Sequence, residues 1–166
     1  MNERIDATAF KRVMRRFPTG VTIVTSLREG SPRGVTVSAF ASVSLEPPTV
    51  LICINRAARS YLYISASKIF CVNVLAAGQR ALAERFAAKL GENQFEGVAY
   101  SIDASGAPVL EGCLAHLDCA VSEEHHVGSH SIFIGRVLSG KARAGEPLGY
   151  LGGAFYDVAI EVSDKA

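Results

Sequence analysis

Hydrophobic residues recur at every fourth position from Ile5 to Phe17, which predicts an amphipathic helix over residues 5–17. Asp6 or Thr8 is available as its N-cap. The other side of this helix carries four basic residues, Lys11, Arg12, Arg15 and Arg16. We interpret them as a solvated face rather than as a contact for membrane or nucleic acid.

After Pro18 the hydrophobic period changes to two. The segments TGVTIVTSL and RGVTVSAFASVSL therefore predict two strands joined by a turn at EGSP. Glu46-Pro47-Pro48 ends the second strand, because proline has no N–H group to donate to a sheet. The apolar run TVLICIN, residues 49–55, is then predicted to be a wholly buried strand.

The rest of the chain continues with two helices and further strands. Helices are expected over residues 59–66 and 79–90, and strands over residues 69–75, 113–123, 130–138 and 154–162. Because strands occur in consecutive groups, a parallel α/β fold fits less well than a mainly β fold. We predict an antiparallel sheet closed as a β-barrel with flanking helices, formed by residues 1–166 as a single domain.

Composition narrows the possible partners. Hydrophobic residues make up 49% of the 166 residues and the net charge is +1, which excludes a disordered tail and gives no electrostatic footprint for nucleic acid. No run of about 18 apolar residues occurs and no signal peptide is recognisable. We therefore expect a soluble, cytoplasmic protein that binds a small molecule or another protein, and neither nucleic acid nor membrane.

The four cysteines form no CxxC pair, so neither a zinc site nor a thioredoxin-like redox site is predicted. Cys53, Cys71 and Cys119 lie in apolar runs and are interpreted as small buried hydrophobes. His125 and His126 would point to opposite faces of a strand, which argues against a metal cluster.

Small and hydroxyl-bearing side chains are concentrated in GVTVSAFASVS, residues 34–44. A half-exposed strand explains this composition without any function. Alternatively, a flat ligand could lie against such a strip while amides, carbonyls and hydroxyls contact its edge. Residues 56–60, RAARS, place two arginines and a hydroxyl where a helix begins, which suits either a phosphate or an ordinary solvated cap.

Common catalytic motifs are absent: the sequence has no GxGxxG, no P-loop, no GxSxG and no HExxH. One candidate remains in His130, which follows Gly128-Ser129 and opens an apolar strand. Its imidazole is expected at the rim of the barrel, where it is either solvated or catalytic.

Five motifs occur in a fixed order: FPTGVTIVTS, PRGVTVSAFASVSLEPPTVLICIN, FCVNVL, GAPVLEGCLAHLDC and GSHSIFIGRV. Together, across residues 10–158, they resemble the flavin reductase-like domain family, which contains the reductase components of two-component flavin-dependent monooxygenases. The resemblance implies a split β-barrel, FMN-binding-like and of antiparallel Greek-key type. It also implies that FMN or FAD is bound at the interface of a homodimer.

The resemblance implies roles for individual residues. The isoalloxazine ring would be lined by Thr36, Val37, Ser38, Ala39, Ser42 and Val43. The ribityl-phosphate arm would be held by Asn55, Ser60, Arg85 and Phe86. His130 matches the histidine of a Gly-Asp-His motif that meets the nicotinamide, and Ser129 stands where that motif has an acidic residue.

The implied function is an NAD(P)H:flavin oxidoreductase. It would transfer a hydride from NADH or NADPH to FMN or FAD and supply the reduced flavin to a partner monooxygenase. One alternative is a non-catalytic flavin-binding module that carries electrons on the same barrel. Another is an oxidase of the related pyridoxamine-phosphate oxidase barrel, which would need a basic cluster in the second half of the chain, for which Lys141 and Arg143 are the candidates.

Overall fold

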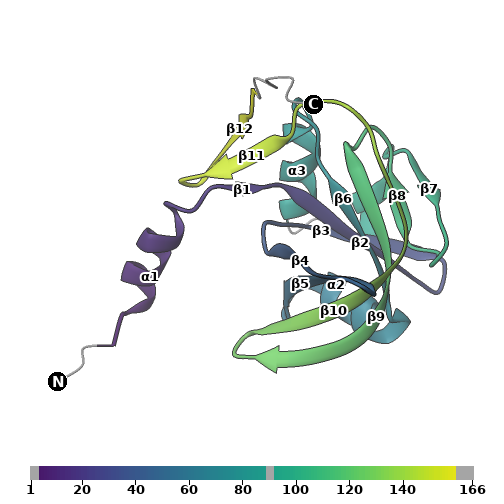
Figure 1. Ribbon diagram of the computed structural model, residues 1–166, viewed down its shortest axis with the longest axis horizontal. Helices are drawn as coiled ribbons and strands as arrows, with labels where there is room; N and C mark the ends of the chain where they lie inside the picture. The colour runs from purple at the N-terminus through teal and green to yellow at the C-terminus, as the bar shows by residue number, and fades with distance from the viewer. Residues whose placement is uncertain (1–3, 89–91, 160–166) are drawn as a thin grey trace.

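The computed structural model describes residues 4–88 and 92–159 (Figure 1). Its helices are α1 (Ala7–Met14), α2 (Arg59–Ser67), α3 (Arg80–Ala87) and the 3-10 helix η1 (Glu92–Phe95). Its strands are β1 (Thr19–Gly20), β2 (Thr22–Arg28), β3 (Ser31–Val37), β4 (Phe40–Leu45), β5 (Pro48–Asn55), β6 (Ile69–Val74), β7 (Tyr100–Ile102), β8 (Pro108–Leu110), β9 (Ala115–Val127), β10 (His130–Ala142), β11 (Leu148–Leu151) and β12 (Ala154–Asp157). No helix in these ranges is long and apolar enough to cross a membrane.

Seven strands form one antiparallel sheet in the order β3-β2-β6-β9-β10-β5-β4. This confirms the predicted mainly β, antiparallel class. The sheet bends around an apolar interior, and its two edges are the consecutive strands β3 and β4 (Figure 1). In the described structure these edges do not pair, so the sheet is open where a closed barrel was expected.

A sharp corner separates the two edge strands. The sequence predicts one strand over residues 33–45, and this is wrong at Ser38 and Ala39. The Phe40 N–H donates to the Ser38 carbonyl at 3.0 Å, and the Cys53 N–H donates to the Ala39 carbonyl at 3.1 Å. The chain therefore leaves its pairing with β2 and begins to pair with β5 within two residues.

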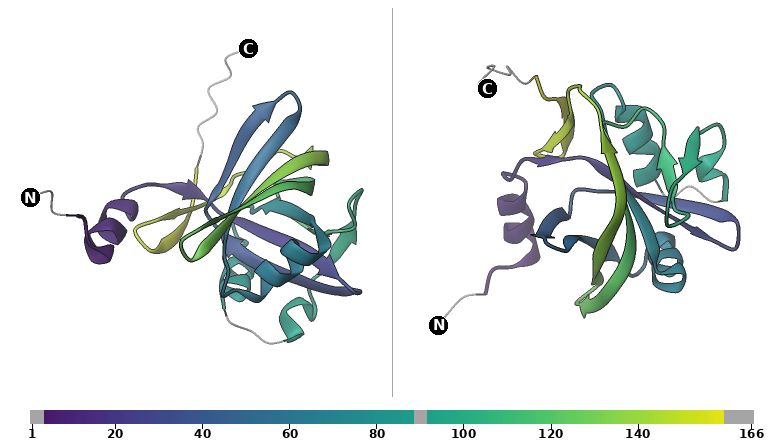
Figure 2. Two further views of the ribbon diagram at one scale, coloured as in Figure 1. Left: turned by 90° about the horizontal axis from the view of Figure 1, so that it is seen from below. Right: turned by 45° about the vertical axis from the view of Figure 1, so that its right-hand side comes forward.

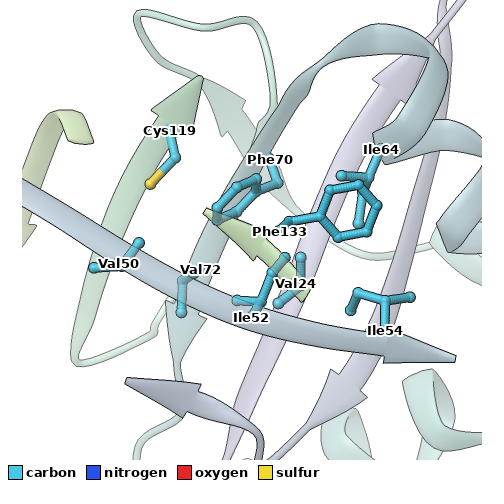
Figure 3. Packing of buried hydrophobic residues seen from close by; sticks show 9 residues of the cluster. All are labelled: Val24, Val50, Ile52, Ile54, Ile64, Phe70, Val72, Cys119 and Phe133. Atoms are coloured by element: carbon cyan, nitrogen blue, oxygen red, sulfur yellow. The ribbon is translucent and has the colours of Figure 1, made fainter. Parts of the chain in front are cut away.

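The interior of the bent sheet is filled by aliphatic and aromatic side chains (Figure 3). Phe70 and Phe133 lie at its centre, and Ile64 of α2 closes one end. The prediction of a wholly buried strand over residues 49–55 is wrong. In β5 only alternate residues, Val50, Ile52 and Ile54, face this core, because β5 belongs to a curved sheet with helices over only part of its outside.

A second core lies outside the sheet, beneath α3 and the short strands. Ile23 of β2 packs there with Phe86, Leu110 and Leu148. Phe86 crosses β3 at Gly34, where an added Cβ would lie 2.6 Å from its ring. Glycine at this position is therefore needed for α3 to dock on β3.

Most other predicted elements occur with shifted ends. The helix expected over 59–66 is α2, the strand over 69–75 is β6, and the helix over 79–90 ends at Ala87. Strands predicted at 113–123 and 130–138 are longer, because β9 and β10 pair as one hairpin of 13 residues on each side. β7, β8 and β11 were not predicted, since runs of three or four residues show little periodicity. Residues 89–90 and 160–162 of the predicted elements lie outside the described ranges.

The predicted first helix forms, but over residues 7–14 only. Asp6 is its cap, since its carboxylate accepts a hydrogen bond from the Ala9 N–H at 2.7 Å. The apolar side of α1 does not reach the core of this chain: Val13 is 59% and Phe17, just after the helix, is 64% exposed. Figure 1 and the left view of Figure 2 show α1 standing away from the sheet.

We expect Gly135→Ala to destabilise the fold by about 1–3 kcal/mol, because a Cβ there would collide with the buried ring of Phe70. An added methyl group would also lie 3.2 Å from Cys119 Cβ. Urea unfolding of the two proteins gives the difference. Gly20→Ala is the matched control, since nothing lies within 4 Å of its added methyl; equal midpoints for both variants would contradict the packing argument.

Candidate functional site

Three adjoining pockets lie along β3 and the corner that follows it. The α2 pocket, about 510 Å³, lies between β3, the end of α3 and the start of α2. The corner pocket, about 210 Å³, lies at the corner after β3, and the α1 groove, about 270 Å³, lies between that corner and α1. Ala87 lines both the α2 pocket and the corner pocket, while Ser38 and Tyr150 line both the corner pocket and the α1 groove. We call the three together the β3 trough.

The α2 pocket is suited to an anion. Arg59 and Ser60 open α2 on its wall, and the N-cap residue Ala58 makes no side-chain capping bond. The first N–H groups of a helix lack partners within the helix and attract negative charge. Asn55 shapes the preceding loop, because its Oδ1 accepts a hydrogen bond from the Ala57 N–H at 2.9 Å.

Arg33 is the second arginine that lines this pocket. It is only 5% exposed, and its guanidinium carbon lies 5.5 Å from the centre of the Tyr63 ring. None of the described residues that line the pocket is Asp or Glu. Its electrostatic character is therefore cationic, as a phosphate group requires.

The corner pocket is suited to a flat ring. It is lined by Thr36, Val37 and Ser38 and by the aromatic pair Tyr150 and Phe155, whose ring centres are 5.2 Å apart. The Thr36 hydroxyl is already engaged, because it donates to the Ala83 carbonyl at 2.6 Å. Ser38 is exposed and brings a second hydroxyl-bearing side chain of this segment to the pocket lining.

Tyr150 and Phe155 were not identified from the sequence. They flank the turn LGGA and lie opposite each other in the β11–β12 hairpin. Two aromatic residues placed symmetrically about a glycine-containing turn were the available signal.

The structure brings six of the predicted site residues into the β3 trough: Thr36, Val37 and Ser38 in the corner pocket, and Asn55, Ser60 and Phe86 in the α2 pocket. Arg85 does not line the trough and instead contacts η1. Its guanidinium donates to the carbonyls of Gln94 at 2.8 Å and Asn93 at 3.1 Å. It therefore holds the η1 segment, which contributes Gln94 to the pocket wall.

The other four predicted residues, Ala39, Ser42, Val43 and His130, do not line the trough. Ser42 and Val43 are exposed on β4, and Ala39 is exposed at the corner. Beside them, the outward side of β4, β5 and β10 is apolar and partly exposed. We call this the outer face; it comprises Ala41, Leu51, Cys53, Ile132 and Ile134, with Val43 exposed beside it at a register shift in β4.

His130 stands at the end of the outer face, opposite Asn55 in the β5–β10 register. Ser129 Oγ lies 2.9 Å from its Nδ1, so the hydroxyl fixes one ring nitrogen. Arg56 holds the same turn twice: its N–H donates to the Ser129 carbonyl at 3.0 Å and its guanidinium to the Gly128 carbonyl at 2.6 Å. Arg56, which the sequence left open between a phosphate contact and a solvated cap, thus supports the turn that carries His130.

Cysteine chemistry is not part of this site. Burial raises the pKa of Cys119 to about 12 and that of Cys113 to about 11, so both remain thiols at neutral pH. Cys71 and Cys119 are fully buried, as the sequence predicted, whereas Cys53 is partly exposed on the outer face.

Residues 14–159 match the family model described as a flavin reductase like domain. Among curated proteins, the chain is 42% identical over 137 residues to the reductase subunit HsaB of a flavin-dependent monooxygenase from Rhodococcus jostii, covering 82% of this chain and 70% of that protein. It is 37% identical over 150 residues to the FMN reductase (NADH) SmoA from Agrobacterium fabrum, covering 90% and 85%.

Solved structures agree with these matches. The NADH:FAD oxidoreductase SgcE6 from Streptomyces globisporus, solved in complex with NAD and FAD fragments, superposes with a TM-score of 0.88. It is 39% identical, and the superposition covers 95% of this chain and 96% of that one.

Proposed function

The chain belongs to the flavin reductase-like domain family, and from this we propose that it is an NAD(P)H-dependent flavin reductase. It transfers a hydride from NADH or NADPH to FMN or FAD and supplies the reduced flavin to a partner monooxygenase. A bound flavin supplies the hydride acceptor, so the chain itself has to bind, orient and shield two rings. The sequence lacks acid–base motifs, which agrees with a protein that binds and positions the two rings while the flavin accepts the hydride.

The observation that carries the proposal is the shape and charge of the β3 trough. An aromatic-walled slot at the corner stands beside a cationic pocket at the start of α2. A flavin nucleotide has the same two parts, a flat ring and a phosphate arm. Ser38 would contact the ring edge, and Ser60, Arg59 and the first N–H groups of α2 would hold the phosphate.

Steady-state oxidation of NADH and NADPH with FMN, FAD and riboflavin tests the function. We expect turnover with excess free flavin and none in flavin-free protein, because no other group of the chain accepts a hydride. Tight binding of one flavin without turnover would favour the alternative, a non-catalytic module that carries electrons.

The phosphate assignment predicts a selective loss of affinity. We expect Arg59→Gln to raise the Kd for FMN about tenfold and to leave the Kd for riboflavin unchanged, because riboflavin lacks the phosphate. Fluorescence titration measures both constants. Arg80→Gln is the control, since Arg80 is exposed and pairs with Glu84 on α3; a matching loss of riboflavin binding by Arg59→Gln would argue against a phosphate contact.

We propose that two copies of the chain form a homodimer of split β-barrels through the outer face. The outer face is a contiguous apolar surface, which soluble proteins usually cover. Ser42, Val43 and His130 lie on or beside it while the remaining site residues line the trough. A dimer in which the outer face of each copy approaches the trough of the other brings these two groups of site residues together.

The proposal extends to a cytoplasmic location, where the buried thiols stay reduced.

We expect Ile132→Glu to convert the dimer into monomers, because it places a charge at the centre of the outer face. Sedimentation equilibrium at micromolar concentration measures the mass. Leu62→Glu is the control, since Leu62 is 55% exposed on α2, away from the outer face. Wild-type protein that sediments as a monomer would refute the dimer.

A further inference from the structure

The α1 groove has no part in binding the flavin described above. It continues the β3 trough beyond the corner, because Ser38 and Tyr150 line both the groove and the corner pocket. Its other wall is the end of α1, which the Gly152 N–H joins to the β11–β12 turn by donating to the Arg15 carbonyl at 3.1 Å. A ligand in the groove would therefore reach the edge of a ring held in the corner pocket.

Two cationic side chains, Lys11 and Arg15, line this groove. They are four residues apart and therefore lie on the same side of the helix. Neither side chain forms an ion pair or hydrogen bond with the described part of the chain. None of the described lining residues is Asp or Glu, so the groove is cationic.

The β3 trough is thus cationic at both ends and aromatic in the middle. Arg33 and Arg59 stand at one end and Lys11 and Arg15 at the other, with Tyr150 and Phe155 between them. A flavin nucleotide and a nicotinamide nucleotide must bring their rings together while each carries anionic phosphates. Phosphates placed at the same end would repel one another, whereas opposite ends keep them apart.

We propose that Lys11 and Arg15 bind the phosphates of the nicotinamide nucleotide, whose ring reaches the corner past Ser38 and Tyr150. The flavin phosphate lies at the opposite end, in the α2 pocket. This inference rests on the proposed function and adds to it the route by which the second nucleotide enters.

The test compares the double variant Lys11→Gln/Arg15→Gln with Arg12→Gln/Arg16→Gln, which removes the same charge from α1 outside the groove. We expect the first to raise the KM for NADH about tenfold at unchanged kcat, and the second to leave it within about twofold. With N-benzyl-1,4-dihydronicotinamide, a hydride donor without phosphates, the first variant should match the wild type.

Calorimetric titration of NAD⁺ into flavin-loaded protein gives a readout without turnover. We expect the Kd for NAD⁺ to rise about tenfold in Lys11→Gln/Arg15→Gln and the Kd for FMN to stay unchanged. An unchanged KM and Kd for the nicotinamide nucleotide, or an equal loss in the control pair, would overturn the inference. A lost preference for FMN over riboflavin would also overturn it, since the flavin phosphate would then lie at α1.

The proposed function can fail separately. Wild-type protein that binds NAD⁺ but reduces flavin with neither donor would refute the reductase. The calorimetric comparison of the two double variants would still decide whether Lys11 and Arg15 form the subsite.

Discussion

Replacing Ser38 by leucine is expected to raise the Kd for flavin roughly ten- to a hundred-fold, a loss of about 1–3 kcal/mol. Ser38 is exposed at the corner and lines the corner pocket, whose volume is about 210 Å³. A leucine side chain would fill much of the slot between the β3 backbone and Tyr150. The β3 backbone on one side of this slot is held in the sheet by hydrogen bonds and cannot shift. The flavin ring would therefore be displaced from the pocket.

The fold should survive this change, because Ser38 packs into neither core. Urea unfolding should therefore give the wild-type midpoint, while fluorescence titration shows weaker flavin binding. Ser101→Leu, on exposed strand β7 and outside the trough, is the control and should bind flavin normally. A folded Ser38→Leu variant with unchanged affinity would show that the flavin ring lies elsewhere.

The strands were predictable where apolar residues form a clear pattern, and the corner was not. VTVSAFASV keeps its alternation through Ser38 and Ala39, so local sequence gives no sign that β3 ends there. The turn depends on the Cys53 N–H, which comes from a strand that begins ten residues after the corner and captures the Ala39 carbonyl. Such a long-range bond overrides local β propensity.

The first helix shows a similar limit. Its spacing correctly predicts an amphipathic helix, but a hydrophobic period does not say which surface covers the apolar side. Val13 and Phe17 remain exposed on this chain, and Lys11 and Arg15, interpreted from sequence as a solvated face, line a groove beside the corner. The end of α1 is joined to the β11–β12 turn by the hydrogen bond from the Gly152 N–H to the Arg15 carbonyl. A contact of this kind depends on the tertiary structure, and the hydrophobic period of the helix does not reveal it.

The family was predictable from five ordered motifs, and the match of residues 14–159 to the family model confirms it. The shape of the site was only partly predictable. Ser38 and Ser60 are 22 positions apart in the chain and line the same trough, yet Arg56 and Arg85, which the sequence suggested as ligand contacts, hold backbone carbonyls instead. Sequence identifies cationic residues near a site, whereas the hydrogen-bond demands of nearby turns determine which of them stay available.

His130→Ala should impair the use of NADH more than the binding of flavin. The backbone of His130 is held by strand pairing with Asn55 and by the turn that Arg56 supports, and its exposed imidazole has Ser129 Oγ at its Nδ1. The imidazole therefore stands at the end of the outer face, where it is accessible to a bound molecule. In the proposed dimer, it faces the trough of the second copy.

Loss of one such positioned contact is expected to slow hydride transfer, or to raise the KM for NADH, by about 1–3 kcal/mol, roughly ten- to a hundred-fold. Stopped-flow reduction of bound flavin measures the transfer, and fluorescence titration should show a much smaller change in flavin affinity. His126→Ala is the matched control, because His126 is an exposed histidine of the same hairpin that pairs with Glu124 and does not share a side of the sheet with Ile132. If His130→Ala reduces flavin as fast as His126→Ala does, the imidazole of His130 is only a solvated side chain at a strand end.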